Sequence, residues 1–155
     1  MILYLVQHGD AVSEDENPER PLSDVGVTQV KKTAAFAAAC RAVTVQTIYH
    51  SGKLRAQQTA EILGRHVQPK NGVRQTDGMT PNDDPQIWAD RLTDMQDDIM
   101  LVGHLPHLSR LAALLLCGNP VQEIVQFRNA GIVCLERDID LGWGVSWAVI
   151  PRILA

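Results

Sequence analysis

The chain has 155 residues, a length that suits one domain with one substantial core. Its hydrophobic fraction of 45% and charged fraction of 21% are typical of globular proteins and exclude an intrinsically disordered chain. The formal net charge of -4, with scattered basic residues, excludes the positive surface by which proteins bind a nucleic-acid backbone. We therefore expect one domain over residues 1–155, one functional site and no nucleic-acid partner.

The sequence predicts neither secretion nor membrane insertion. The apolar start, Met1–Val6, is too short for the core of a signal peptide, and no other segment has the length needed to cross a bilayer. The three cysteines, Cys40, Cys117 and Cys134, are far apart without metal-binding spacing, and we interpret them as small buried side chains. These features predict a cytoplasmic protein that has no membrane partner.

The first half of the chain alternates apolar strand segments with segments of helical periodicity. In chain order we predict a strand at Ile2–Val6, a polar loop at Asp10–Leu22, a helix from Ser23 to about Arg41, a strand at Val45–Tyr49 and a helix after Gly52. Ser23 and Asp24 are residue types that cap helices. The loop is long for a compact domain, and long ordered loops are often binding elements.

The second half continues this alternation and ends in a hairpin. It predicts a short strand at Val73–Thr76, a turn at Pro81–Pro85, a helix at Gln86–Met95, a buried strand at Asp98–Gly103, a helix from Pro106 to Gly118, and strands at Ile132–Glu136 and Val145–Ile150 around a turn at Asp140–Gly144. The whole pattern predicts an α/β three-layer sandwich. We expect a mainly parallel sheet with helices on both faces and an antiparallel edge hairpin near the C-terminus.

Three predicted strands run into polar turns that carry histidine or arginine. The turns are Gln7-His8-Gly9-Asp10, Ser51-Gly52-Lys53-Leu54-Arg55-Ala56 and Gly103-His104-Leu105-Pro106-His107. In an open α/β sheet, ligands bind at the carboxyl ends of the strands, so we expect these turns to meet in one crevice. Each residue alone has an ordinary structural explanation, but two histidines and an arginine in one crevice favour an anion site.

This combination of residue types suits phosphoryl transfer. A neutral imidazole, here that of His8, can attack phosphorus when its other ring nitrogen is held by an acceptor. Arginine offers forked, permanently charged donors to the phosphoryl oxygens, and Arg55 is in position to do so. A glycine beside the nucleophile, Gly9, permits close backbone approach.

Four motifs in order resemble a known family. They are strand-x-His8-Gly9-Asp10-Ala11, Arg20-Pro21-Leu22-Ser23, Ser51-x-x-x-Arg55-Ala56-x-Gln58-Thr59 and His104-Leu105-Pro106. Together they resemble the phosphoglycerate mutase-like histidine phosphatase superfamily, and in particular its short branch, the SixA-type phosphohistidine phosphatases. The resemblance extends from Ile2 to about Leu116, and it is the combination of motifs that is specific.

The resemblance implies roles for the motif residues. His8 would form a transient phosphohistidine that water then hydrolyses, with His8, Arg55 and His104 as the catalytic residues. Arg20 and Arg55 would bind the phosphoryl oxygens, and His104 would donate a further hydrogen bond to them. Gly9 lies in the same phosphate-binding turn. The short branch also lacks the insertions that cover the sites of its relatives, which leaves an open site that accepts a phosphorylated protein surface.

One position departs from the family pattern, which has an arginine before the catalytic histidine. Gln7 keeps an amide donor that can reach a phosphoryl oxygen but carries no charge, and removal of one transition-state donor costs on the order of 100-fold in rate. In the interpretation we favour, Lys53 and Arg20 replace the missing charge and the protein is a working phosphatase. In the alternative, it is a phosphate-binding module with little turnover.

The substrate follows from the leaving group. No carboxylate is clearly placed as a general acid; Asp83 and Asp84 are the candidates by order along the chain, although both also suit a turn. An imidazole leaves more readily than an alkoxide, which favours phosphohistidine. We therefore expect a phosphorylated protein, for example a histidine-phosphotransfer domain, or else a small phosphorylated substrate hydrolysed by a phosphomonoesterase activity.

Other phosphate chemistries find no support in the sequence. No cysteine has an arginine six positions later, as a thiol-dependent phosphatase requires, and no glycine-rich nucleotide loop occurs. His104 and His107 are three residues apart but lack a nearby carboxylate to complete a metal site. We therefore expect neither a metal nor a cofactor.

Overall fold

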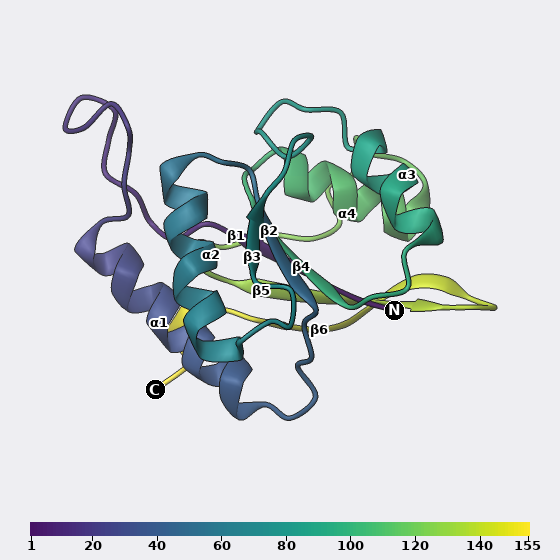
Figure 1. Cartoon of the computed structure of the whole chain (residues 1–155). Coiled ribbons are helices and arrows are strands. Elements are labelled where there is room, and N and C mark those ends of the chain that lie inside the picture. Colours follow the sequence, from purple (N-terminus) through teal and green to yellow (C-terminus); the bar gives the residue numbers. More distant parts are fainter.

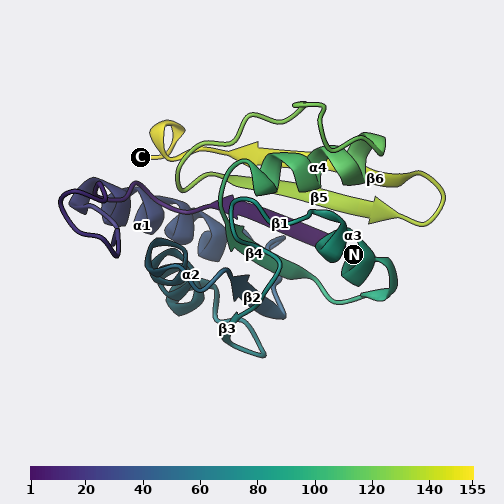
Figure 2. The ribbon, with the colours of Figure 1, turned by 90° about the horizontal axis from the view of Figure 1, so that it is seen from above.

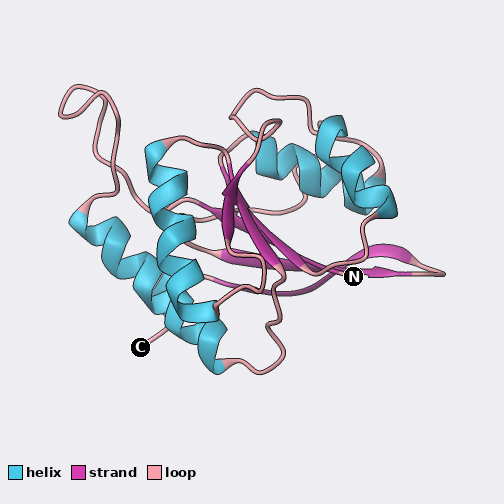
Figure 3. Cartoon of the chain, in the orientation of Figure 1, coloured by secondary structure: helices cyan, strands magenta, loops and turns pink.

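A six-stranded sheet with helices on both of its faces forms the framework of the protein (Figure 1). A computed structural model describes all 155 residues. The elements are β1 (Ile2–Gln7), α1 (Asp24–Ala39), β2 (Thr47–His50), α2 (Leu54–Val67), β3 (Val73–Gln75), α3 (Gln86–Asp94), β4 (Ile99–Gly103), α4 (His107–Cys117), β5 (Ile132–Asp138), β6 (Gly142–Val149) and a 3-10 turn, η1 (Pro151–Ile153). Figure 3 shows how helices and strands alternate until the final pair of strands.

The strand order is β3-β2-β4-β1-β5-β6, which Figure 2 shows from above. Strands β1 to β4 pair in parallel, whereas β5 is antiparallel to β1 and forms an antiparallel hairpin with β6 at the edge. The predicted α/β sandwich, with its mainly parallel sheet and antiparallel edge hairpin, is therefore confirmed. None of the helices combines the length and the apolar composition that crossing a membrane requires.

The core lies in two layers because the central strand β1 is buried on both faces. Tyr4 and Val6 pack into the layer beneath α1 and α2, whereas Leu3 and Leu5 pack into the layer beneath α3 and α4. All four side chains are at most 1% exposed. This two-sided burial follows from the alternation of side chains along a strand, and it explains why β1 is a continuous apolar run.

The edge hairpin differs from its predicted bounds. Strand β6 begins at Gly142 rather than at Val145, and β5 continues to Asp138. Gly142 takes a left-handed conformation with φ of 75°, so the chain turns before it, and Trp143 pairs with Arg137 across the hairpin. The guanidinium of Arg137 lies 5.5 Å from the centre of the Trp143 ring. The sequence prediction treated these glycine and tryptophan residues as turn residues, and they belong to the strand.

The cysteines are free, as the sequence predicts, but they are not all buried. Cys134 is buried in β5 and Cys40 is half-buried after α1. Cys117 is exposed at the end of α4, where its thiol contacts the carbonyl oxygen of Ala113. The expectation of three buried side chains is therefore wrong at Cys117, because this residue ends α4 and begins the exposed segment that follows the helix.

The loop that follows β1 packs directly on the first turn of α1. The N-cap residue Ser23 accepts a hydrogen bond from the backbone N–H of Gly26 at 3.0 Å and donates one to a carboxylate oxygen of Asp10 at 2.6 Å. A Cβ atom added to Gly26 would lie 2.0 Å from the backbone oxygen of Asp10. The helix therefore needs a glycine at this position for the loop that carries His8 to reach its place.

Gly26→Ala should force this loop away from α1. We expect it to lower the free energy of unfolding by about 1–3 kcal/mol, because the obstructing atoms belong to the backbone and cannot rotate away. Urea denaturation measures the change. Gly144→Ala is the matched control, since its added Cβ meets nothing within 4 Å. Equal unfolding midpoints for the two variants would contradict this account of the packing.

Candidate active site

The parallel strands β1, β2 and β4 end at one edge of the sheet, so the turns that follow them lie close together. Gln7 is in register with Gly103, and His50 is in register with Val102. The backbone N–H of His8 donates to the carbonyl oxygen of Gly103 at 3.0 Å, which joins the first turn to the third. The turns after these strands therefore meet at one edge of the sheet, as the sequence predicts.

The three residues expected to form the catalytic centre come together there. The imidazole rings of His8 and His104 have their centroids 5.0 Å apart, at an interplanar angle of 53°. The Nε atom of Arg55, in the first turn of α2, donates to Nε2 of His8 at 3.3 Å. Residues separated by up to 96 positions in the sequence thus surround one small space.

The His8 ring is held as one tautomer. Its Nδ1 atom lies 2.7 Å from the carbonyl oxygen of Gly9, and because a carbonyl only accepts, Nδ1 carries the proton. The bond from Arg55 reaches Nε2, which therefore presents its lone pair. Burial, followed by the charges of Arg55 and Arg20, lowers the pKa of His8 from 6.5 to about 4, against the opposing effect of the Gly9 carbonyl. At neutral pH the ring is therefore neutral, with a lone pair on Nε2.

Helix α2 holds the nucleophile turn through a buried threonine. The hydroxyl oxygen of Thr59 accepts from the backbone N–H of Gly9 at 3.0 Å and donates to the carbonyl oxygen of Arg55 at 2.7 Å. A Cβ atom on Gly9 would come within 2.7 Å of the Val30 side chain of α1. Gly9 was expected to bind phosphate, but its N–H is used by Thr59, and its lack of a side chain serves packing against α1.

Arg20 reaches the site from the long loop after β1. The Ala11–Leu22 bridge closes this loop, and the side-chain oxygen of Gln58 in α2 accepts from the backbone N–H of Leu22 at 2.8 Å. Arg20 has a left-handed φ of 49°, and its Nε donates to the carbonyl oxygen of Val12 at 3.0 Å. Its charge helps to lower the pKa of both His8 and Arg55, which places the two arginines near each other.

Neither of these two arginines has a carboxylate partner. The ion pairs of the protein are Arg65–Glu61 and Arg91–Asp77, both away from the crevice. Burial, followed by the charge of Arg20, lowers the pKa of Arg55, so the free guanidinium is held at an electrostatic cost. Two uncompensated guanidinium groups beside a neutral imidazole form a site that favours an anion.

His104 is almost fully buried, with 1% of its surface exposed. Its Nε2 atom lies 2.6 Å from the hydroxyl oxygen of Ser51, which also accepts from the backbone N–H of Lys53 at 3.4 Å. Its Nδ1 atom is buried and has no partner. Burial, followed by the positive charge that His8 and Arg55 can carry, lowers the pKa of His104 to about 3. The ring is neutral, and its Nδ1 is left without a hydrogen-bond partner inside the protein.

Gln7 does not extend a free amide toward the anion site. Its Nε2 donates to the side-chain oxygen of Asn129 at 2.7 Å, and its Oε1 is buried without a partner. The backbone N–H of Ala130 also bonds to the carbonyl oxygen of Gln7, at 3.0 Å. The amide donor that the sequence offered to a phosphoryl oxygen is therefore used to join β1 to the segment before β5. Asn129 gave no recognisable signal in the sequence.

The remaining charged candidates divide between the site and a turn. Lys53, the exposed N-cap residue of α2, is close enough to help lower the pKa of His104. Asp83 accepts from the backbone N–H of Thr80, and Asp84 accepts from that of Gln86. Both carboxylates act electrostatically on the buried His107 of α4 and have no contact with His8. They stabilise the turn that precedes α3.

Protonation of His8 in the folded protein should occur near pH 4, well below its normal range. Because the unfolded chain takes up this proton near pH 6.5 and the folded chain does not, stability should fall as the pH falls from 6.5 toward 4. An NMR titration of the His8 ring measures the first effect and thermal unfolding the second. The urea-unfolded chain is the reference. A folded-state transition at or above pH 6.5 would show that the ring is not held neutral.

Comparison with known proteins identifies a family to which the sequence is similar and solved structures that have the same fold. Residues 3–80, half of the chain, match the family described as histidine phosphatase superfamily (branch 1). Among curated proteins, none matches the chain significantly. Several solved structures do so, and at identities below 25% they show a shared fold.

Three of these structures cover nearly the whole chain. The protein histidine phosphatase SixA complexed with tungstate has a TM-score of 0.86 at 22% identity, with 99% of each chain covered. A putative phosphohistidine phosphatase SixA from Agrobacterium tumefaciens has a TM-score of 0.75 at 22% identity, with 97% of each covered. A phosphoserine phosphatase mutant from Entamoeba histolytica has a TM-score of 0.72 at 16% identity, with 99% of each covered. By the family match over half of its length, the chain belongs to branch 1 of the histidine phosphatase superfamily and is a phosphatase of that superfamily.

Proposed function

We propose that the protein is a phosphohistidine phosphatase that works through a phosphohistidine intermediate on His8. One observation carries the proposal. The Nδ1 proton of His8 is held by the Gly9 carbonyl, so Nε2 keeps its lone pair, which accepts a hydrogen bond from Nε of Arg55 at 3.3 Å. This arrangement prepares a neutral imidazole to attack a phosphoryl group bound by the arginine.

The first step transfers the phosphoryl group to the enzyme. Nε2 of His8 forms a bond to phosphorus while the bond from phosphorus to the substrate's imidazole nitrogen breaks, and that imidazole takes up a proton from solvent. His8 becomes a cationic phosphoimidazole, whose Nδ1–H remains bonded to the Gly9 carbonyl. Arg55 and Arg20 neutralise the phosphoryl oxygens, and Nδ1 of His104 donates to one of them.

The second step regenerates the free enzyme. Water attacks phosphorus from the side opposite His8, the P–N bond to Nε2 breaks, and inorganic phosphate leaves with the proton balance made up by solvent. The lowered pKa of His8, about 4, makes the neutral imidazole a good leaving group. Neither step consumes a cofactor.

The choice of a phosphohistidine substrate rests on the missing general acid. Asp83 and Asp84, the two candidates for this role, are each hydrogen-bonded within their own turn. An alkoxide needs such an acid, whereas an imidazole, with an ordinary pKa of about 6.5, takes its proton from water. The SixA structures, which share the fold, are of proteins described as acting on phosphohistidine.

Replacing the nucleophile tests the proposal directly. His8→Ala should reduce the hydrolysis of a phosphohistidine peptide by at least about 1000-fold, as removal of a catalytic nucleophile does in other covalent enzymes. Phosphate release measures the rate. His66→Ala, which removes an exposed histidine of α2, is the control and should leave the rate unchanged. Binding of the peptide without His8-dependent turnover would instead identify a phosphate-binding module, and faster turnover of p-nitrophenyl phosphate would favour a small phosphomonoester.

Because position 7 carries no charge, we predict that the Gln7→Arg variant hydrolyses its substrate faster than the wild-type protein. A guanidinium there would add a transition-state donor, and we expect kcat to rise by about 10-fold or more. Gln7→Met is the matched control, because it also breaks the bond to Asn129 but adds no charge. A similar rate for both variants would contradict the account of position 7 as an electrostatic deficit.

A further inference from the structure

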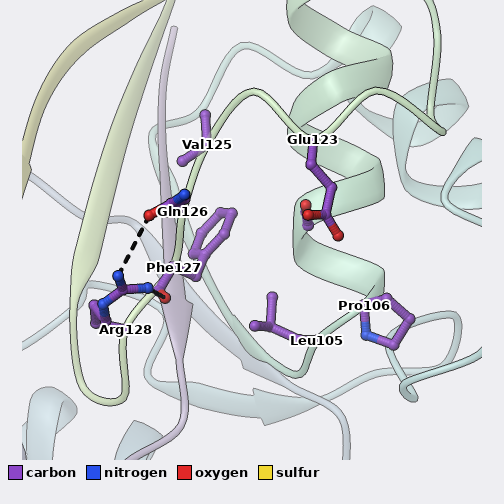
Figure 4. Close-up of a pocket in the computed structure, with 8 residues that line it drawn as sticks. Leu105, Pro106, Glu123, Val125, Gln126, Phe127 and Arg128 are labelled. Atoms are coloured by element: carbon purple, nitrogen blue, oxygen red, sulfur yellow. Dashed lines mark hydrogen bonds between the residues drawn. The ribbon is translucent and has the colours of Figure 1, made fainter.

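A groove beside the proposed phosphoryl site has no part in the chemistry described above. It has a volume of about 390 Å³, and its walls are the start of α4 and the segment that precedes β5. We call this groove the side groove. Figure 4 shows the residues that line it, among them Leu105, Pro106, Glu123, Val125, Phe127 and Arg128.

The walls of the side groove adjoin residues of the proposed site at two points of the chain. Leu105 on one wall directly follows His104, whose buried Nδ1 has no hydrogen-bond partner. Arg128 on the other wall directly precedes Asn129, which accepts a hydrogen bond from Gln7. Both walls therefore begin beside the proposed phosphoryl site.

Part of the side groove is apolar, because Leu105, Val125 and Phe127 line it. Phe127 is 4% exposed, whereas Leu105 is 40% exposed. A free phosphohistidine or a small phosphoester has no apolar group beyond its phosphorylated part that could contact this surface. A polypeptide substrate can contact it with an apolar side chain that lies near the phosphorylated residue.

The charges of the side groove are separated and unpaired. The guanidinium of Arg128 bonds only to neutral acceptors, the carbonyl oxygen of Phe127 at 3.0 Å and the side-chain oxygen of Gln126 at 3.3 Å. Glu123 forms no ion pair, and it lies across the pocket from Arg128 with Phe127 and Leu105 between them (Figure 4). A bound polypeptide that complements these charges therefore has an apolar residue in the groove and an acidic residue next to it, on the side of Arg128.

We propose that the side groove binds the polypeptide that flanks the phosphorylated histidine of a protein substrate, with an apolar side chain over Phe127 and a carboxylate at Arg128. This inference rests on the proposed function and adds to it the sequence context that the enzyme selects. Arg128 is then a specificity residue, and it takes no part in the transfer of the phosphoryl group.

Peptides with chosen flanks test the inference. Two phosphohistidine peptides, one with Leu-Asp and one with Leu-Lys beside the phosphorylated residue, are compared with p-nitrophenyl phosphate. The wild-type protein should prefer the Leu-Asp peptide in kcat/KM by about 5- to 10-fold, the size of effect that one charge pair at an interface produces. Arg128→Glu should reverse this preference, and its rate on p-nitrophenyl phosphate reports that the catalytic site is intact.

Arg152→Glu makes the same change of charge in η1, on an exposed residue distant from α4, and should leave the peptide preference as in the wild type. A preference that Arg128→Glu leaves unaltered would overturn the inference, as would equal losses on all three substrates. His8-dependent hydrolysis with no peptide preference would refute the side groove alone. Hydrolysis that does not depend on His8 would refute the proposed function, and the groove inference with it.

Discussion

The hydrogen bond between Nδ1 of His8 and the carbonyl oxygen of Gly9 is the constraint on which the rest of the site depends. It is a bond between adjacent residues, so it forms only if the turn after β1 has one particular shape. Thr59 holds that shape by accepting from the Gly9 N–H, and α1 closes over it because Gly9 and Gly26 have no side chains. The tautomer of His8 is thus set by backbone packing at some distance from its Nε2 atom, the atom that we propose attacks phosphorus.

Burial and charge then act together on the chemistry. The crevice removes His8 and His104 from water, which lowers the pKa of each, while two arginines without carboxylate partners remain beside them. Both effects make further positive charge in the site unfavourable and make the binding of a phosphoryl group favourable, because its negative charge neutralises the arginines. The same electrostatic balance that keeps the imidazole nucleophilic therefore favours the substrate.

Patterns local in the sequence predicted the fold and the meeting of His8, Arg55 and His104 at one edge of the sheet. The sequence predicts the apolar runs of β1 and β4 and the turns after them, because strand burial and helix caps depend on neighbouring residues. Parallel strands then bring such turns to one edge of the sheet. The hydrogen-bond partners of these residues could not be predicted. Asn129 bonds to Gln7 across 122 positions, and nothing in the sequence indicates that Ser51 contacts His104. The contact of Gly9 with Val30 and the bond of its N–H to Thr59 were not predicted either. Contacts of this kind depend on side-chain geometry that no spacing encodes.

The central claim, that His8 attacks phosphorus from Nε2 within a ring of Arg55, Arg20 and His104, is tested most directly by a crystal structure with bound vanadate. The account predicts vanadium bonded to Nε2 of His8, oxygens bonded to both guanidinium groups and to Nδ1 of His104, and the Nδ1–Gly9 hydrogen bond retained. Vanadate bound elsewhere, or a His8 ring that turns Nδ1 toward the metal, would contradict it.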